Sequence, residues 1–331
     1  MEMLWHYAMT ENMTNQNAGY SMWGFAKKDG KDYFVKQFLS PKYPAHDTES
    51  SPERLRRKQE KCEQFVAQKR KIYERVNTCS DGNDVRICEF FRVETKYYLS
   101  MEKIIALPLD IGAIAALDIA EKRRLCAIIA HSVAALHRGG LVHADLKHEN
   151  ILFMRTKNGT LTAKIIDFDS AFLEAEPPGE EEEIVGDWVY FSPEAWERIS
   201  GGQVELTCKI DVFALGILFH QYFAGELPGF NHDACSAAGQ ALQQGYALQL
   251  SEMLPADIAE LLETMLARDP EARPSAQEVF RHFRATLAET GAEDAAVAYE
   301  EPVTEELGAP EPESKPEAPP LAGPFYRPGN L

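Results

Sequence analysis

Three polar side chains of complementary chemistry fall within six residues of the chain. Asp145 is a carboxylate that could accept a proton, Lys147 is an amine two residues later, and Asn150 is an amide that could bind a metal ion. They follow a helix-like segment and precede a strand-like one. The spacing indicates a loop that presents one base and one metal ligand.

A second carboxylate, Asp167, ends the next strand-like run. A hairpin between Ile151 and Ile166, turning at Asn158-Gly159, would carry Asp167 back beside Asn150. Carboxylate and amide oxygens are ligands that hard divalent cations favour. The sequence therefore predicts one cleft that holds a base, a metal-binding amide and a metal-binding carboxylate.

The elements around this cleft follow from periodicity and turn signals. Before the loop, apolar residues recur at helical spacing from Ile119 on, and Gly139-Gly140 ends that helix. The N-terminal part favours strands, interrupted by a long basic helix. The expected strands are 15–26, 32–38, 85–93 and 97–101, and the expected helix runs from residue 52 to about residue 76.

Five motifs in this order resemble those of protein kinases. Residues 143–150 resemble the catalytic loop of that family, and Asp167-Phe-Asp169 resembles its metal-binding triplet. The resemblance covers roughly residues 15–285 and implies an α+β, bilobal protein-kinase-like fold. A small β-rich N-lobe with the hinge would occupy residues 1–104, and a larger helical C-lobe residues 105–285. The three remaining motifs are 186–194, 211–216 and 269–274.

The resemblance assigns a role to each residue of the loop. Phosphoryl transfer in this family depends on in-line positioning and on neutralising charge. Asp145 would accept the hydroxyl proton, and Lys147, which is typical of Ser/Thr-directed kinases, would contact the γ-phosphate. Asn150 and Asp167 would hold Mg²⁺. The implied activity is that of an ATP- and Mg²⁺-dependent Ser/Thr protein kinase acting on a protein substrate.

By the same resemblance, the nucleotide would bind to the N-lobe. Lys36 stands where the family keeps the lysine that pairs the α- and β-phosphates. Gly19 belongs to what remains of the glycine-rich loop, in which the pattern Gly-x-Gly-x-x-Gly is absent. The adenine would hydrogen-bond to the backbone of the gatekeeper and hinge segment, formed by Met101, Glu102, Lys103 and Ile104.

Two N-lobe residues depart from the family pattern. Phe34 replaces the usual Ala above the adenine, so it would either narrow that pocket or alter the pose of the nucleotide. Gln68 falls where a helix Glu normally holds the phosphate lysine, and an amide cannot form that ion pair. Glu60 and Glu63 lie nearby, but they would need the helix to shift by about one to two turns.

Three C-lobe residues also depart from it. Ala144 replaces the Arg that contacts a loop phosphate in many kinases, and few hydroxyls lie between residues 170 and 191. We therefore expect activity that does not depend on phosphorylation of this loop. Asp169 replaces a Gly and would either stiffen the triplet or add a carboxylate near the metal. Asp187 replaces a Thr and would either pair with Lys147 or repel the catalytic carboxylate.

Other residues are expected to support the fold rather than to catalyse. By resemblance, Asp211 braces the backbone of the catalytic loop from an apolar helix. Glu194 and Arg273 would form a buried ion pair, and removing one partner of such a pair leaves an unpaired buried charge.

Composition limits the remaining classes of function. The chain has 45% apolar and 26% charged residues and a formal net charge of −18. This is typical of a globular protein that binds neither nucleic acid nor anionic membranes. Its six cysteines lack metal-ligand spacing and are expected to be free thiols in a reducing compartment. Neither a membrane span nor a signal peptide is indicated, so a cytoplasmic location is expected.

Residues 286–331 are rich in proline and acidic residues and are expected to form a disordered tail. The helix around residues 54–75 is, in contrast, very basic. The tail would act either as a spacer or as an arm that docks its acidic side chains on that helix and tunes the active site.

Three functions stay open on the sequence. An active protein kinase is favoured by the retained residues Lys36, Asp145, Lys147, Asn150 and Asp167. The altered N-lobe positions and the depleted glycine loop favour a pseudokinase that acts as a nucleotide-binding or scaffolding module. A small-molecule kinase on a related fold is disfavoured, because the motifs at 192–194 and 269–274 resemble protein kinases specifically.

Overall fold

The computed structural model describes residues 3–16, 21–45, 50–80, 82–179 and 184–289. These residues form two compact units. The first contains the residues up to Tyr73 together with Val85–Ile104, and the second contains Glu74–Asp84 and the residues from Ile105 onward. Residues 74–84, which the sequence placed in the N-lobe, thus belong to the second unit.

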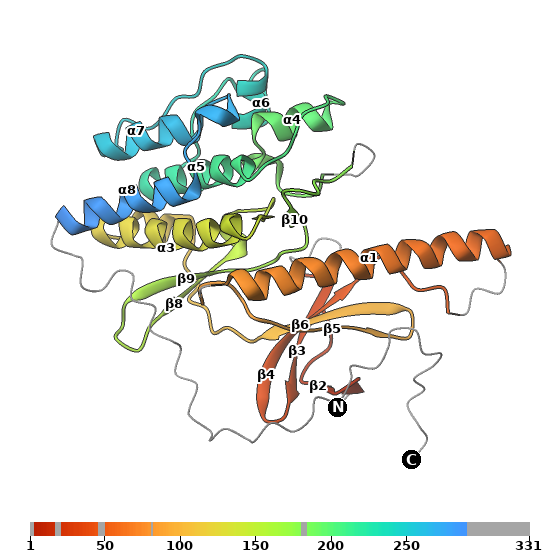
Figure 1. The fold of residues 1–331 in the computed structure, drawn as a ribbon. Coiled ribbons are helices and arrows are strands. Elements are labelled where there is room, and N and C mark those ends of the chain that lie inside the picture. Colours follow the sequence, from red (N-terminus) through yellow and green to blue (C-terminus); the bar gives the residue numbers. More distant parts are fainter. Residues whose placement is uncertain (1–2, 17–20, 46–49, 81, 180–183, 290–331) are drawn as a thin grey trace. The chain divides into compact units, whose positions relative to one another are not determined.

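The first unit is built on one antiparallel sheet (Figure 1), with the strand order β1-β2-β3-β4-β6-β5. The expected turn after Lys28 is present, and Asp29 and Gly30 both have positive φ, as a tight hairpin between twisted strands requires. The strands are β1 (Met3–Leu4), β2 (Tyr7–Met9), β3 (Ser21–Lys28), β4 (Lys31–Phe38), β5 (Ile87–Val93) and β6 (Lys96–Glu102).

Strands β1 and β2 were not expected from the sequence, and they extend the sheet beyond β3. The Tyr7 hydroxyl donates to Glu89 Oε2 at 2.9 Å and lies 2.7 Å from Ser100 Oγ. Its ring stacks on Phe91 at 5.6 Å. Tyr7 of β2 is therefore part of the core of this unit.

Helix α1 (Pro52–Cys79) packs on the opposite face of the sheet through Phe65. The ring of Phe65 lies 5.4 Å from those of Phe38 and Tyr97 and 6.0 Å from that of Phe90. Ser51 Oγ accepts a hydrogen bond from the Arg54 N–H in the first turn, as a helix-start residue should. The residues of α1 after Tyr73 belong to the second unit.

The second unit is mainly helical (Figure 1), and α8 runs along α3. Helix α5 is buried on all sides from Ile210 to Phe223, which explains its mostly apolar sequence. The helices are α2 (Ile111–Ala115), α3 (Ile119–Arg138), α4 (Pro193–Ile199), α5 (Lys209–Ala224), α6 (Ala238–Gln243), α7 (Ala256–Met265) and α8 (Ala276–Glu289). Its short strands are β7 (Leu141–Val142), β8 (Ile151–Arg155), β9 (Leu161–Ile165) and β10 (Phe172–Leu173), and its 3-10 turns are His148–Asn150, Trp188–Tyr190 and Pro270–Ala272.

Side-chain caps fix where the helices next to the site begin. Asp118 accepts from the Glu121 N–H at 2.8 Å and starts α3. Ser192 accepts from the Ala195 N–H at 3.3 Å and starts α4, with Pro193 at the first helical position. The chain just before α4 is therefore anchored at its junction with the helix.

A small β-rich unit and a larger helical unit confirm the α+β class. Helix α8 continues to Glu289, past residue 285, where the sequence placed the end of the lobe. The rest of the expected acidic tail lies outside the described residues. Across the described part of the chain, no helix combines the length and the apolar character that crossing a bilayer requires. All six cysteines fall within that part, and each is a free thiol.

Candidate active site

The structure brings three of the predicted residues into direct contact. Lys147 Nζ lies 2.9 Å from Asp145 Oδ2 and 3.1 Å from Oδ1. Asn150 Nδ2 donates to the backbone oxygen of Asp145 at 2.7 Å and to Oδ2 at 3.0 Å. The backbone N–H of Asp187 donates to Oδ1 at 3.1 Å. The Asp145 carboxylate is therefore fixed in orientation by donors from three different residues.

Asp211 holds the backbone that carries this carboxylate, as the sequence predicted. Its Oδ2 accepts from the His143 N–H and its Oδ1 from the Ala144 N–H, both at 2.8 Å. His137 Nε2 lies 2.9 Å from Oδ2. Burial favours a raised pKa for Asp211, but the hydrogen bonds and charges of the two histidines outweigh it and lower the pKa. The lowered pKa favours the ionised carboxylate of Asp211, which accepts the two hydrogen bonds from the loop backbone.

The hairpin that was to return Asp167 to the loop is confirmed. Strands β8 and β9 pair antiparallel with Ile151 opposite Ile165. The turn between them includes Gly159, which has a φ of +79°. The Ile166 N–H donates to the Asn150 backbone oxygen at 3.0 Å, so Asp167 follows directly after the residue bonded to Asn150.

His143 joins the loop to the same hairpin, a role that the sequence analysis missed. Its side chain is buried, and its Nε2 lies 3.1 Å from the Ile166 backbone oxygen. Its ring contacts that of Phe168 at 4.9 Å between centroids. The buried imidazole therefore links the loop to the segment that carries Asp167.

The two acids of the triplet, Asp167 and Asp169, differ in backbone conformation. Asp167 has a φ of +64°, as does Ala144 in the catalytic loop, and both are left-handed conformations that cost side-chain-bearing residues energy. Asp169 is not among the positive-φ residues of the described chain. Its Cβ therefore meets no left-handed backbone strain here. A stiffer triplet and a further carboxylate near the metal both stay predictions.

The side chain of Asp187 does not form the ion pair with Lys147 that was one of its two expected roles. Its Oδ1 accepts from the Val189 N–H at 3.0 Å and caps the 3-10 turn Trp188–Tyr190. Lys147 pairs with Asp145 instead. The carboxylate of Asp187 is thus used locally, while the backbone N–H of the same residue contacts the carboxylate of Asp145.

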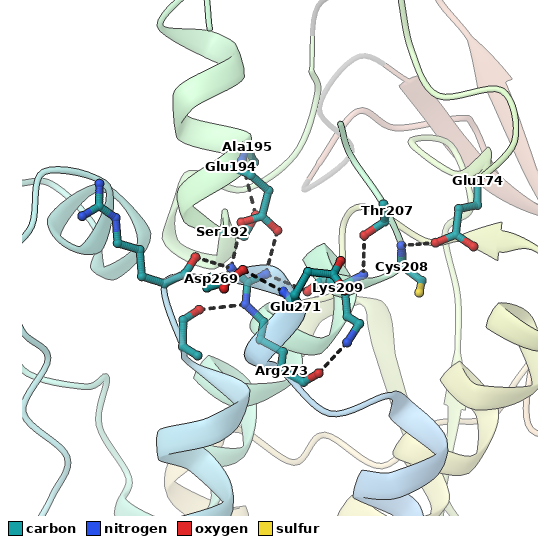
Figure 2. A network of polar contacts seen from close by, with 12 residues as sticks. Glu174, Ser192, Glu194, Ala195, Thr207, Cys208, Lys209, Asp269, Glu271 and Arg273 are labelled. Atoms are coloured by element: carbon teal, nitrogen blue, oxygen red, sulfur yellow. Dashed lines mark hydrogen bonds and ion pairs between the residues drawn. The ribbon is translucent and has the colours of Figure 1, made fainter. Parts of the chain in front are cut away.

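The predicted buried ion pair joins Glu194, in the first turn of α4, to Arg273, which follows the 3-10 turn Pro270–Ala272. Figure 2 shows Arg273 bonded to both oxygens of Glu194, at 2.6 Å and 2.8 Å. Arg273 also donates to backbone oxygens of Ala267, Lys209 and Arg268. This bidentate arrangement satisfies both charges inside the fold.

The predicted nucleotide residues of the first unit are placed by the sheet. Lys36 is 8% exposed and lies on β4 between Trp23 of β3 and Leu99 of β6. Phe34 shares its face and packs on Trp23, with ring centroids 5.6 Å apart. Lys36 thus belongs to a face lined by aromatic residues. Gly19 lies outside the described residues.

The hinge segment uses part of its backbone within its own unit. The Glu102 N–H donates to the Arg86 oxygen at 3.4 Å, and the Lys103 N–H to the Asp32 oxygen at 3.3 Å. Met101 pairs with Phe34 across the strands. Two of the hinge N–H groups therefore already have partners, and Ile104 follows as the last residue of the unit.

The sequence placed Gln68 where the family keeps its helix Glu, and in the structure its neighbour Lys69 lies on the packed face of α1. Gln68 is exposed, whereas Lys69 is 8% exposed, and its Nζ lies 5.8–6.0 Å from the ring centroids of Phe38, Phe65 and Tyr73. Both positions fit the spacing to Phe65, but the buried Cys62 and Tyr73 place position 69 at the centre of the packed face. Lysine, not glutamine, therefore faces the sheet.

The two alternative acids on this helix also face outward. Glu60 and Glu63 are exposed, and Glu60 pairs with Arg56 at 3.5 Å. The inward face of α1 within the first unit thus carries a cation where the family pattern expects an acid.

Comparisons with known proteins agree with this geometry. The serine/threonine-protein kinase PkaA of Streptomyces coelicolor is 33% identical over 162 residues, 48% of this chain and 28% of that protein. Serine/threonine-protein kinase Pkn1 of Myxococcus xanthus is 30% identical over 220 residues, 65% and 31% of the two chains. A putative serine/threonine-protein kinase of Saccharomyces cerevisiae is 29% identical over 199 residues, 60% and 21%. The chain spans about a fifth to a third of the length of these relatives.

A family model described as the protein kinase domain matches residues 53–283, well over half of the chain. The match includes the catalytic loop, the hairpin that carries Asp167 and the buried Glu194–Arg273 pair. This chain belongs to the protein kinase domain family.

Proposed function

We propose that this chain is an active Ser/Thr protein kinase that transfers the γ-phosphate of ATP to hydroxyl groups of a protein substrate. The observation that supports this most directly is the Asp145 carboxylate, held by Lys147, Asn150 and the Asp187 N–H. Its supporting loop is braced by Asp211. A site ordered in this way can position an acceptor without reorganising during the reaction.

In this mechanism Asp145 accepts the proton of the acceptor hydroxyl and orients its oxygen. Lys147 carries its positive charge beside that carboxylate and would contact the γ-phosphate. The acceptor specificity rests on Lys147 and on the Ser/Thr kinase relatives.

Asn150 and Asp167 fit the requirements of Mg²⁺. The Nδ2 of Asn150 donates to Asp145, so its Oδ1 is the atom left to bind a cation. The β8–β9 hairpin adds the Asp167 carboxylate next to it, and oxygen ligands suit this ion. Bound Mg²⁺ would neutralise charge on the phosphates.

Lys36 and Gly19 are proposed to contact the phosphates of ATP, and the backbone of 101–104 its adenine. The support for Lys36 is its position on a fully paired strand, where it is mostly buried. Aromatic neighbours such as Phe34 would shape the adenine pocket from the same face.

Independence from loop phosphorylation is also part of the proposal. The loop around Ala144 is held by Asp211 and the Asp187 N–H contacts Asp145, so both contacts form without a guanidinium at position 144. The catalytic loop therefore reaches this conformation without an arginine that binds a phosphorylated residue.

A pseudokinase is the second candidate, and one observation favours it. The inward face of α1 presents Lys69, and Glu60 and Glu63 are exposed, so a cation stands on the packed face of a helix that carries an acid there in the family pattern. Such a module would bind nucleotide or act as a scaffold without transferring phosphate.

Location and partners stay predictions. The net charge of −18 supports a cytoplasmic protein that binds neither nucleic acid nor anionic membranes. A contact within the chain, between the acidic tail and the basic helix 54–75, is also predicted.

The test is phosphate incorporation from labelled ATP with Mg²⁺, with and without a generic basic protein, for the full chain. Asp145→Asn is expected to lower the rate by about 10²–10⁴-fold. Asp233→Asn, which changes an exposed aspartate of the same unit, is expected to leave it unchanged.

Equal incorporation by the wild type and Asp145→Asn would exclude the kinase activity. A rise in melting temperature with Mg²⁺-ATP would then identify a nucleotide-binding pseudokinase, and no rise would leave a scaffold.

A further inference from the structure

The catalytic loop is anchored to α5 at its first residues. Asp211, in the first turn of that helix, accepts from the N–H groups of His143 and Ala144 at 2.8 Å. Lys147 and Asn150 come three and six residues after Ala144. Their side chains have to be placed as closely as the base that they contact, so this end of the loop needs an anchor of its own.

His148 stands between Lys147 and Asn150 and begins the 3-10 turn that ends at Asn150. Its ring has a partner at each nitrogen. Nε2 lies 3.0 Å from the backbone oxygen of Leu109, and Nδ1 lies 3.3 Å from the hydroxyl oxygen of Tyr222. A half-buried side chain that is held at both polar atoms has one orientation, and it fixes the backbone to which it is attached.

The two partners determine which ring nitrogen donates. The backbone oxygen of Leu109 can only accept, so Nε2 of His148 carries a proton. In the neutral ring Nδ1 is then the acceptor of the Tyr222 hydroxyl. Tyr222 is buried, and burial raises the pKa of its hydroxyl well above the usual range, so the hydroxyl keeps its proton and can donate.

Tyr222 connects His148 to the helix that already holds the start of the loop. Helix α5 carries Asp211 in its first turn and Tyr222 near its end. The residue before Tyr222, Gln221, accepts from the Tyr190 hydroxyl at 2.9 Å and so holds the turn that ends at Tyr190. One buried helix therefore contacts both ends of the catalytic loop and the next turn on the acceptor side.

Leu109 belongs to a segment that has its own fixed points. The Leu107 N–H donates to the backbone oxygen of Phe153 in β8 at 2.7 Å. Asp110 caps the first turn of α2 with its side chain. The backbone oxygen of Leu109 lies between these two points, so it is a well-placed acceptor for the ring of His148.

We propose that His148 is a positioning residue for phosphoryl transfer, which sets the places of Lys147 and Asn150 through its bonds to Leu109 and Tyr222. The inference rests on the proposed kinase activity. Lys147 and Asn150 both bond to the carboxylate that accepts the proton, so a displaced turn would disturb all three groups. A misplacement of about 1 Å can cost about 10²-fold in rate.

The test compares two replacements of His148 in the full chain. His148→Leu has a comparable size but no hydrogen-bonding atom, and it should lower kcat by at least about tenfold. The KM for ATP should stay within about twofold, because the proposed adenine contacts lie at 101–104. His148→Gln can place an amide N–H where Nε2 stands and keep the bond to Leu109, so its kcat should stay within about threefold of the wild type.

Two further variants calibrate this comparison. Tyr222→Phe removes only the hydroxyl of the longer bond and should lower kcat by about two- to fivefold. His232→Leu changes an exposed histidine of the same unit and should leave kcat within about twofold. Rates are measured at a temperature at which circular dichroism shows every variant to be folded.

Hydrogen exchange provides a measurement that does not need catalysis. The Asn150 N–H donates to the Lys147 oxygen at 3.1 Å, so its exchange reports the order of the turn. In peptides that cover 147–151, His148→Leu should exchange at least about tenfold faster than the wild type, and His148→Gln at most about threefold faster. If the wild type transfers no phosphate, the proposed function fails, and the exchange rates decide by themselves whether His148 anchors the turn.

Four results would overturn the proposal. An unchanged kcat in His148→Leu would show that the placement of the turn does not depend on the ring. Equal losses in the Leu and Gln variants would show that the bond to Leu109 is not the cause. A raised KM for ATP at constant kcat would assign His148 to nucleotide binding. Unchanged exchange in His148→Leu would show that the turn is ordered without this anchor.

Discussion

The catalytic loop and helix α1 both carry charged side chains, but they hold them in different ways. In the loop, Asp145 accepts several hydrogen bonds from fixed donors, and Asp211 of α5 accepts several from the loop backbone and His137. On α1, most charges are exposed, Arg56 and Arg57 each pair with a glutamate one turn away, and the one inward charge, Lys69, lies among aromatic rings. The contacts of the loop follow from the identity of its residues. Those of α1 depend on whether position 68 or position 69 faces the sheet.

Breaking the buried ion pair between Glu194 and Arg273 in the second unit should have the largest effect on stability. Glu194→Gln leaves Arg273 buried without its carboxylate and should lower the free energy of unfolding by about 3–5 kcal/mol. Glu53→Gln breaks the exposed pair with Arg57 and should cost about 0.5 kcal/mol or less. Urea unfolding of the full chain measures both, and similar losses would remove the distinction between the two regions.

This difference also explains what the sequence could predict. The β8–β9 hairpin was predictable because Asn158-Gly159 sets the turn and the turn sets the register. The roles of Asp211 and of the pair Glu194–Arg273 followed from the resemblance of their motifs to those of protein kinases.

The rest depended on packing that no local pattern encodes. On α1, positions 68 and 69 are both compatible with the apolar spacing, and only the contacts of Cys62 and Tyr73 decide between them. Strand β2 was missed because three residues around Tyr7 are too short to show an alternating pattern, and the partners of Tyr7 lie more than 80 residues away.

Removing the side chain of α1 that faces the sheet should have an intermediate effect on stability. Lys69→Ala removes a mostly buried stem and a cation near three rings, and should cost about 1–2 kcal/mol of stability. Gln68→Ala changes an exposed side chain and should stay within about 0.5 kcal/mol of the wild type. Thermal and urea unfolding test the pair, and a larger loss for Gln68→Ala would restore the register expected from the sequence.

The smallest effect should have the opposite sign, and it concerns the backbone of the catalytic loop. Ala144 is held at a φ of +64° by the bond from its N–H to Asp211. A left-handed residue with a Cβ costs about 1–2 kcal/mol, and glycine avoids that cost but loses a methyl contact and gains freedom in the unfolded chain. Ala144→Gly should therefore stabilise the protein by about 0.5 kcal/mol. Ala127→Gly, in the interior of α3, should destabilise it by about 1–2 kcal/mol. A loss of stability in both variants would show that the loop conformation is not strained, and the bracing by Asp211 would then hold a relaxed backbone in place.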